Sequence, residues 1–266
     1  MERETLLKRI EKLPWKGQYF FTYSDVEKWF PDKDKQYLRV ALSRLTSKGK
    51  IISPWRNFYV VMPTEYALVG KVPPIFYIGA LMRSLDRDYY ICLLSAAAMY
   101  GSSHQSPQSF SVMVPPPHIR SGIKNGTKLN FYEKKELPYG YVNKIKNRIG
   151  YINVSSPELT VLDLIEYQAA VGGLSRAVTV IEGLRDKLNF EKMDIDLYKN
   201  FHLSTVQRLG YVLDTVIGLK KQAEAIYSIT KYLGYRKTVL KVGKLAGFSY
   251  DEKWKIIVNQ KIEVDE

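Results

Sequence analysis

The sequence has a single cysteine, three histidines and no apolar run long enough to cross a membrane. Because Cys92 cannot form a disulfide within the chain, we expect a reducing compartment. The apolar neighbours of Cys92 predict a buried thiol and not a nucleophile. The first residues, from Met1 to Thr5, are too highly charged for a signal peptide. We therefore expect a cytoplasmic protein.

Motifs of common enzyme classes are also missing. The sequence contains neither of the glycine-rich phosphate loops, G-x-x-x-x-G-K-[ST] and G-x-G-x-x-G, and no G-x-S-x-G elbow. The histidines His104, His118 and His202 lie far apart and lack the spacing of metal ligands. Asp163 and Glu166 alternate with apolar residues on a predicted helix, where we expect solvated charges. We expect no enzyme, no bound metal and no cofactor.

Positive charge is what the sequence has in excess. Lys and Arg number 40 against 27 Asp and Glu, which gives a formal net charge of +13 over 266 residues. A surplus of this size favours a polyanionic partner, such as DNA, RNA or an anionic membrane face, although a lysine-rich solvated surface has the same composition. The length suggests two domains.

The first 62 residues predict a helix, a short strand, two further helices and a β-hairpin, in that order. The apolar spacing places helices at residues 2–13 and 34–48. Between them, Ser24 and Glu27 have the spacing of a capping box, which predicts a helix that ends before Pro31. Strands are expected at residues 50–53 and 58–62. This order is typical of a winged helix-turn-helix, which we expect at residues 1–68.

The predicted helix at residues 34–48 suits the major groove of duplex DNA. Leu38, Leu42 and Leu45 share one side, which leaves polar side chains on the other. Arg can contact guanine, Gln can contact adenine, and Lys at the helix ends suits phosphates. Trp55, in the hairpin turn, either packs against a sugar or braces the hairpin. The predicted DNA contacts are Lys33, Lys35, Gln36, Arg39, Ser43, Arg44, Ser47, Lys48, Lys50, Arg56 and Asn57.

The remainder of the chain predicts a larger mixed domain. A linker rich in Gly and Pro is expected at residues 69–74, followed by a C-terminal α+β domain at 75–266. The patterns predict helices at 75–85 and 89–101, an antiparallel sheet over 110–154, then four helices and a last strand at 254–258. The fold class is therefore α+β: an N-terminal winged helix-turn-helix domain followed by a larger mixed α/β C-terminal domain.

A second basic segment lies within the predicted sheet. Residues 118–148 carry eight basic and two acidic side chains, a net charge of +6. Three interpretations stay open: the segment extends a DNA footprint, it binds RNA or an acidic protein, or it is a solvated sheet face. Its basic residues are Arg120, Lys124, Lys128, Lys134, Lys135, Lys144, Lys146 and Arg148.

Three stretches of the chain each resemble a stretch of one known protein family. They are the winged helix from Leu42 to Val60, the run from Ile91 to Gly101, and the run from Val154 to Leu164 with the later Gly172-Gly173. Together with the ending at 254–259, they resemble the AbiEi-type antitoxins of bacterial abortive-infection, type IV toxin–antitoxin systems. The resemblance implies a repressor that binds inverted repeats in its operator. It also implies a C-terminal domain that counters a nucleotidyltransferase-like toxin without a stable complex.

Two other functions stay open at this point. The chain could be a ligand-responsive winged-helix transcriptional regulator without a toxin, or a nucleotide-handling enzyme that the winged helix targets to DNA. Ligand-dependent thermal stabilisation would favour the first, and turnover of labelled nucleotides would favour the second.

Overall fold

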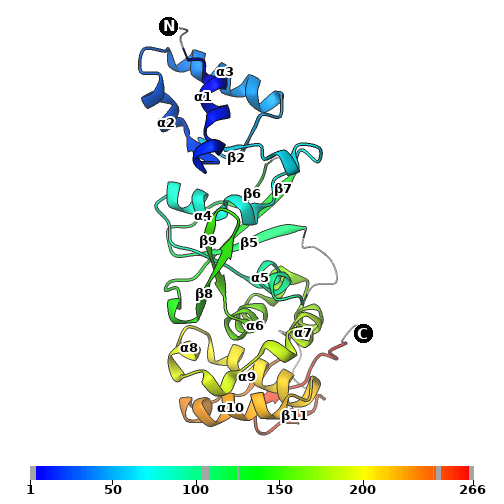
Figure 1. Cartoon of the computed structure of the whole chain (residues 1–266). Helices are drawn as coiled ribbons and strands as arrows, with labels where there is room; N and C mark the ends of the chain where they lie inside the picture. The colour runs from blue at the N-terminus through cyan, green and yellow to red at the C-terminus, as the bar shows by residue number, and fades with distance from the viewer. Residues whose placement is uncertain (1–3, 103–107, 125, 242, 244–246, 264–266) are drawn as a thin grey trace.

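The computed structural model describes residues 4–102, 108–124, 126–241, 243 and 247–263. His104 and the first two residues of the predicted helix at 2–13 lie outside these ranges. The chain forms an elongated molecule, with the N-terminal helices at one end and the last helices and strands at the other (Figure 1). Within the described ranges, every helix falls short of the length or apolar character that a bilayer crossing requires.

The N-terminal region has the element order that the sequence predicts. Its strands pair antiparallel in the order β1-β3-β2, so the predicted hairpin is present with β1 beside it. The arrangement is compatible with a winged helix-turn-helix. The elements are α1 (Leu6–Lys12), β1 (Phe20–Thr22), α2 (Tyr23–Trp29), α3 (Lys35–Ser47), β2 (Ile51–Trp55) and β3 (Phe58–Val61).

The capping box of α2 involves other residues than predicted. The N-cap is Thr22, whose hydroxyl accepts a hydrogen bond from the Asp25 backbone N–H at 3.2 Å. In return, the Asp25 carboxylate accepts from the Thr22 N–H at 2.7 Å. The prediction of Ser24 with Glu27 was wrong by two residues. Both pairs have the three-residue spacing of a capping box, and the helix begins at the earlier pair because it follows directly on the end of β1.

A six-stranded mixed sheet forms the middle of the molecule, in the order β6-β7-β5-β4-β9-β8. The prediction of a purely antiparallel sheet was wrong, because β5 pairs parallel with β7 and β4 pairs parallel with β9. The predicted helix at 89–101 is also shorter, since Tyr90 and Ile91 form a buried central strand. The elements are α4 (Pro74–Ser84), β4 (Tyr90–Ile91), α5 (Leu93–Met99), β5 (Ser109–Val114), β6 (Gly122–Lys124), β7 (Thr127–Glu133), β8 (Val142–Asn147) and β9 (Gly150–Ser155).

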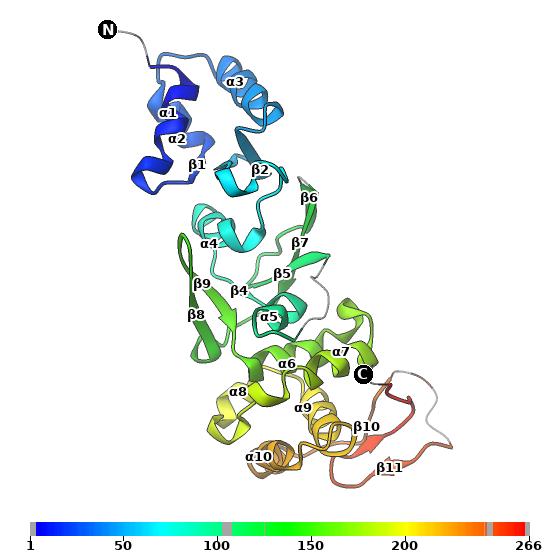
Figure 2. The same cartoon turned by 45° about the vertical axis from the view of Figure 1, so that its right-hand side comes forward.

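Helices pack below the sheet and carry a small three-stranded sheet at the far end (Figure 2). Ser156 caps α6 by accepting from the Leu159 N–H at 3.2 Å, and Pro157 is the first helical residue, as predicted. A π-helical turn (Val212–Val216) follows α9. The elements are α6 (Pro157–Glu166), α7 (Leu174–Glu182), α8 (Ile195–Lys199), α9 (Leu203–Tyr211), α10 (Lys220–Thr230), β10 (Thr238–Val239), β11 (Tyr250–Asp251) and β12 (Ile256–Ile257).

The C-terminal segment is held against the last helices by a buried tryptophan. The Trp254 side chain is fully buried, and its indole N–H donates to the Asp214 carboxylate at 3.0 Å. The ring lies so close to α9 that a Cβ on Gly210 would come within 2.0 Å of it. Glycine is required at that position because any side chain would displace the indole.

The hairpin β2–β3 shares its core with the C-terminal part of the chain. Ile52, Phe58 and Val60 belong to the same buried cluster as residues of α4 and of the large sheet. The Phe20 ring also lies 5.7 Å from the Phe76 ring of α4. The winged-helix region is therefore packed against the rest of the molecule, and the division at residues 69–74 remains a prediction.

Candidate nucleic-acid interface

Helix α3 lies with α1 and α2 at one end of the molecule, and one of its sides is buried (Figure 1). Leu38, Leu42 and Leu45 are buried in the N-terminal core. Asp34 caps the helix by accepting from the Gln36 and Tyr37 N–H groups at 2.8 and 3.1 Å. The three leucines fix the rotation of the helix, so the polar side chains face outward.

Every predicted DNA contact is exposed in the structure. The set lies on α3, at its two ends and in the turn between β2 and β3. No member is withdrawn into a core, so each is free to approach a ligand. The exposed residues are Lys33, Lys35, Gln36, Arg39, Ser43, Arg44, Ser47, Lys48, Lys50, Arg56 and Asn57.

The two arginines of α3 differ in their surroundings. The Arg39 guanidinium lies 4.4 Å from the centroid of the Tyr23 ring, a cation–π contact that restricts the side chain. The Tyr23 hydroxyl in turn donates to the Lys35 carbonyl at 3.1 Å. Arg44 forms no ion pair within the described part of the chain. Arg39 is thus held in place against the protein, whereas Arg44 is free to reach outward.

Two of the predicted phosphate contacts already have carboxylate neighbours. Lys35 lies 3.6 Å from Glu27, and Lys50 lies 3.6 Å from Glu11. Exposed pairs of this kind contribute only about 0–1 kcal/mol. Both lysines can therefore exchange a carboxylate for a phosphate at little cost.

The hairpin turn places Arg56 and Asn57 at its tip. Asn57 has a backbone φ of 58°, a left-handed conformation that Asn adopts more readily than most residues. Its carbonyl accepts from the Tyr23 N–H at 2.9 Å, which ties the turn to α2. The Trp55 ring packs edge-on against Phe131 of β7 at 5.4 Å. Of the two roles considered for Trp55, the structure shows that it braces the hairpin.

The prediction omitted Tyr37, which belongs to the same face. The side chain is 57% exposed and lines a groove of about 420 Å³ between α1 and α3, together with Leu7, Val40 and Arg44. The sequence contained the signal, because Tyr37 lies two helical turns before Arg44 on the outward side of α3.

The second basic segment does not form one surface. Lys124 and Lys128 lie on β6 and β7 at one edge of the large sheet, with Arg120 in the loop before β6. Lys144 and Lys146 lie on β8 at the opposite edge. Arg148 is exposed but pairs with Glu65, and Lys135 is exposed on the loop after β7. The eighth member, Lys134, is only 9% exposed. Its prediction as a surface residue was wrong.

Lys134 is instead part of a buried polar cluster. Its ammonium lies 3.5 Å from the Asp163 carboxylate, 3.6 Å from the centroid of the Phe201 ring, and donates to the Asn200 carbonyl at 3.2 Å. The Tyr90 hydroxyl donates to the other Asp163 oxygen at 3.0 Å. Burial raises the pKa of Asp163 to about 6, against the lowering effect of Lys134. Asp163 was predicted to be solvated, and the structure shows it fully buried.

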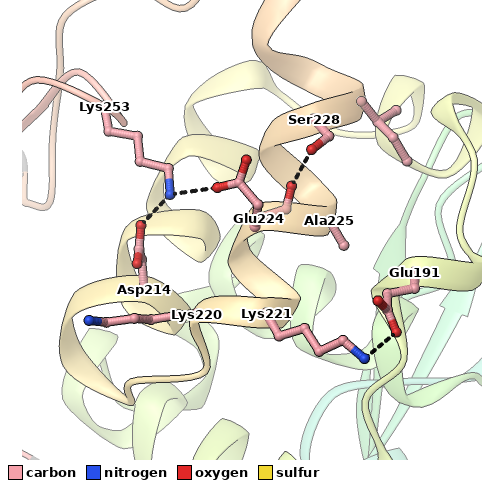
Figure 3. A pocket seen from close by; sticks show the side chains of 9 residues that line it. Glu191, Asp214, Lys220, Lys221, Glu224, Ala225, Ser228 and Lys253 are labelled. Atoms are coloured by element: carbon pink, nitrogen blue, oxygen red, sulfur yellow. Dashed lines mark hydrogen bonds and ion pairs between the residues drawn. The ribbon is translucent and has the colours of Figure 1, made fainter.

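A groove of about 760 Å³ along α10 is lined by both acidic and basic side chains (Figure 3). Lys253 bridges Asp214 at 2.7 Å and Glu224 at 3.1 Å. Burial raises the pKa of Asp214, but hydrogen bonds from Lys253 and Trp254 outweigh it and bring the pKa below its usual value. These charges neutralise one another. Among the described residues, no group of three or more His, Cys, Asp or Glu is placed to hold a metal ion.

The comparisons with solved structures concern the fold. The RV2827C protein from Mycobacterium tuberculosis is similar over 94% of this chain and 89% of that chain, with a TM-score of 0.66 and 13% sequence identity. An antigenic nucleotidyltransferase-like protein from Paracoccidioides brasiliensis reaches a TM-score of only 0.35 at 13% identity, over 56% of this chain and 89% of that one.

The sequence comparisons concern the family. No curated protein matches the chain. Residues 89–215, from β4 to the π-helical turn after α9, match the family model of the AbiEi antitoxin C-terminal domain. The resemblance seen in the sequence is therefore confirmed for this region, which is similar to the AbiEi antitoxin C-terminal domain.

Proposed function

We propose that this protein is an antitoxin that binds duplex DNA and represses its own operon, with α3 in the major groove. The observation that carries the proposal is the outward face of α3, where polar side chains are exposed above three buried leucines. A helix with one anchored apolar side and one exposed polar side is the element that enters a major groove in helix-turn-helix proteins.

The surroundings of each side chain suggest its role. Arg44, which has no carboxylate neighbour among the described residues, and Gln36 reach the base edges, where Arg pairs with guanine and Gln with adenine. Arg39, held over Tyr23, contributes a fixed positive charge at the groove edge. Lys33 and Lys48 at the helix ends contact phosphates, which position the protein without reading sequence.

The footprint continues along one edge of the large sheet. The hairpin lies against β6 and β7 through the contact between Trp55 and Phe131 (Figure 2). This contact places the hairpin that carries Arg56 beside the strands that carry Lys124 and Lys128. Of the interpretations open for the second basic segment, we therefore propose extension of the DNA footprint for the β6–β7 edge alone.

The DNA-binding part is tested with the double substitution Arg39→Ala/Arg44→Ala. We expect it to abolish binding of the full-length protein to the DNA upstream of its own operon, measured by fluorescence anisotropy. The wild type should lose affinity steeply with salt, with a log–log slope near −5 for about six neutralised phosphates. Unchanged binding by the double variant would contradict the assignment of α3.

Because Arg39 packs on Tyr23, its replacement also removes a stabilising contact. The single substitution Arg44→Ala avoids this difficulty, since Arg44 is exposed and has no ion pair within the described residues. Circular dichroism and the midpoint of thermal unfolding should match the wild type for Arg44→Ala. Its loss of DNA affinity then reports the interface alone.

The antitoxin role rests on the family of residues 89–215. We infer that this domain counters a nucleotidyltransferase-like toxin encoded beside it. Co-expression of the full-length chain with the toxin should restore growth, and the Arg39→Ala/Arg44→Ala variant should restore growth equally while failing to repress the operon. Loss of both activities together would show that the two functions are not separable in this way.

A further inference from the structure

The end of the molecule opposite α3 has a surface where basic and aromatic side chains alternate. It lies over the end of α10 and the small sheet β10-β12-β11 (Figure 1). The segment 227–256 carries seven basic and two acidic side chains, a net charge of +5. We name this the C-terminal basic–aromatic surface, formed by Lys231, Tyr232, Arg236, Lys237, Tyr250 and Lys255.

Cations and rings are in direct contact across this surface. The Lys231 ammonium lies 4.9 Å from the centroid of the Tyr232 ring. On the small sheet, Lys237 and Lys255 lie 5.2 and 6.0 Å from the centroid of the Tyr250 ring. Each exposed ring therefore has a positive charge beside it, which is the pairing that a nucleotide with its base and phosphate requires.

Three of the cations are uncompensated. Lys231, Arg236 and Lys237 are exposed, and within the described ranges none of them pairs with a carboxylate. Lys255, in contrast, is bound to Glu252 at 3.0 Å. The groove along α10 is different again, because its lysines are largely matched by acids. An anion is therefore attracted to this surface and not to the groove.

The Tyr232 and Tyr250 rings are exposed for stacking, and the elements that carry them pack on a buried aromatic cluster. Tyr232 is 82% exposed and Tyr250 is 36% exposed. Beneath them, Tyr227 packs against the buried Trp254 at 5.4 Å, and Tyr235 packs against the same ring at 6.0 Å. The buried indole fixes the elements that carry the two exposed rings, so little order has to be gained on binding.

We propose that the C-terminal basic–aromatic surface binds a single-stranded segment of RNA. Paired bases are stacked inside a duplex and cannot pack on protein rings, whereas unpaired bases in loops and ends can. The surface lies at the far end from α3, so the two sites are independent and one chain can hold duplex DNA and an unpaired RNA strand together (Figure 1).

Fluorescence anisotropy of the full-length protein with a labelled 12-nucleotide single-stranded RNA tests the proposal. The double substitution Tyr232→Ala/Tyr250→Ala should weaken binding about tenfold or more, because each stacked base contributes substantially to affinity. Lys231→Ala/Lys237→Ala should reduce the log–log salt slope by about 1.4, since each neutralised phosphate contributes about 0.7 for a single strand. Single-stranded DNA of the same sequence shows whether the 2′-hydroxyls contribute.

A matched variant controls for the loss of two exposed tyrosines. Tyr139 and Tyr151 are 48% and 62% exposed and lie outside this surface, so Tyr139→Ala/Tyr151→Ala should bind RNA like the wild type. The Arg39→Ala/Arg44→Ala variant should also retain full RNA affinity, which separates this proposal from that of the DNA interface. The proposal is overturned if the wild type does not bind the RNA at 150 mM salt, or if the tyrosine variant binds as tightly as the control. Displacement of the RNA by duplex DNA at equal concentration would also overturn it.

Discussion

The two basic segments of the sequence, α3 with its ends and residues 118–148, are arranged differently in the folded protein. On α3, the helical period places the polar side chains on one side because three leucines occupy the other. In residues 118–148, a similar density of charge is divided between two sheet edges and the interior. Charge counted along a sequence therefore predicts a surface only when a single element holds the charged residues together.

The largest expected effect concerns Lys134, the member of the second segment that is buried. Lys134→Met removes the counter-ion of Asp163 and leaves a carboxyl group in a fully buried site without a cation. Loss of one partner of a buried ion pair costs about 3–5 kcal/mol. We expect the free energy of unfolding, measured with urea at pH 7.5, to fall by about that amount.

A second variant separates this charge effect from damage to packing. Lys134→Met/Asp163→Asn removes both charges with little change in volume and should recover most of the lost stability. Duplex DNA affinity should stay at the wild-type level in this double variant. If Lys134→Met alone leaves stability unchanged, the two charges are not coupled as the structure indicates.

The next effect concerns the bracing of the hairpin. Trp55→Ala removes the edge-on contact with Phe131 and should lower the free energy of unfolding by about 1–3 kcal/mol. If Trp55 contacted DNA directly, the main effect would be on affinity instead. Urea unfolding and DNA titration of the same variant distinguish the two, and Trp55→Phe should preserve most of the stability.

A smaller effect is expected at the β6–β7 edge. Lys124→Ala/Lys128→Ala should weaken duplex DNA binding about five- to tenfold and reduce the salt slope by about 1.8, for two phosphates at about 0.9 each. An unchanged slope would show that the footprint ends at the hairpin.

The pH dependence of stability gives a further test of the buried pair. The folded-state pKa of Asp163, about 6, lies above the usual 3.8, so the protonated side chain favours the folded state. This contribution is complete below about pH 4 and is lost as the pH rises through 6. Thermal unfolding midpoints of the wild type should therefore decline across that window relative to Lys134→Met/Asp163→Asn. Parallel curves for the two proteins would contradict the assignment.

Local rules explain what the sequence predicted well. Asp34 and Gly49 mark the ends of α3, and Ser156 with Pro157 marks the start of α6, because caps depend on neighbouring residues alone. The buried state of Cys92 also followed from its apolar neighbours and is confirmed.

Long-range contacts explain what the sequence could not predict. Tyr90 and Ile91 form a strand only because β5 and β9 lie on either side, although the run also fits a helix. Asp163 meets Lys134 and Tyr90 from other elements, and nothing near it in sequence distinguishes it from the largely exposed Glu133. The burial of a charge depends on a partner that the fold supplies.

The most direct test of the central claim compares two variants of equal net charge. Arg39→Ala/Arg44→Ala and Lys144→Ala/Lys146→Ala each remove two exposed cations, the first pair from α3 and the second from β8. At one salt concentration, we predict that the α3 variant loses at least about 100-fold in duplex DNA affinity. The β8 variant should stay within about twofold of the wild type. Equal losses would contradict the account, because binding would then follow total charge and not the outward face of α3.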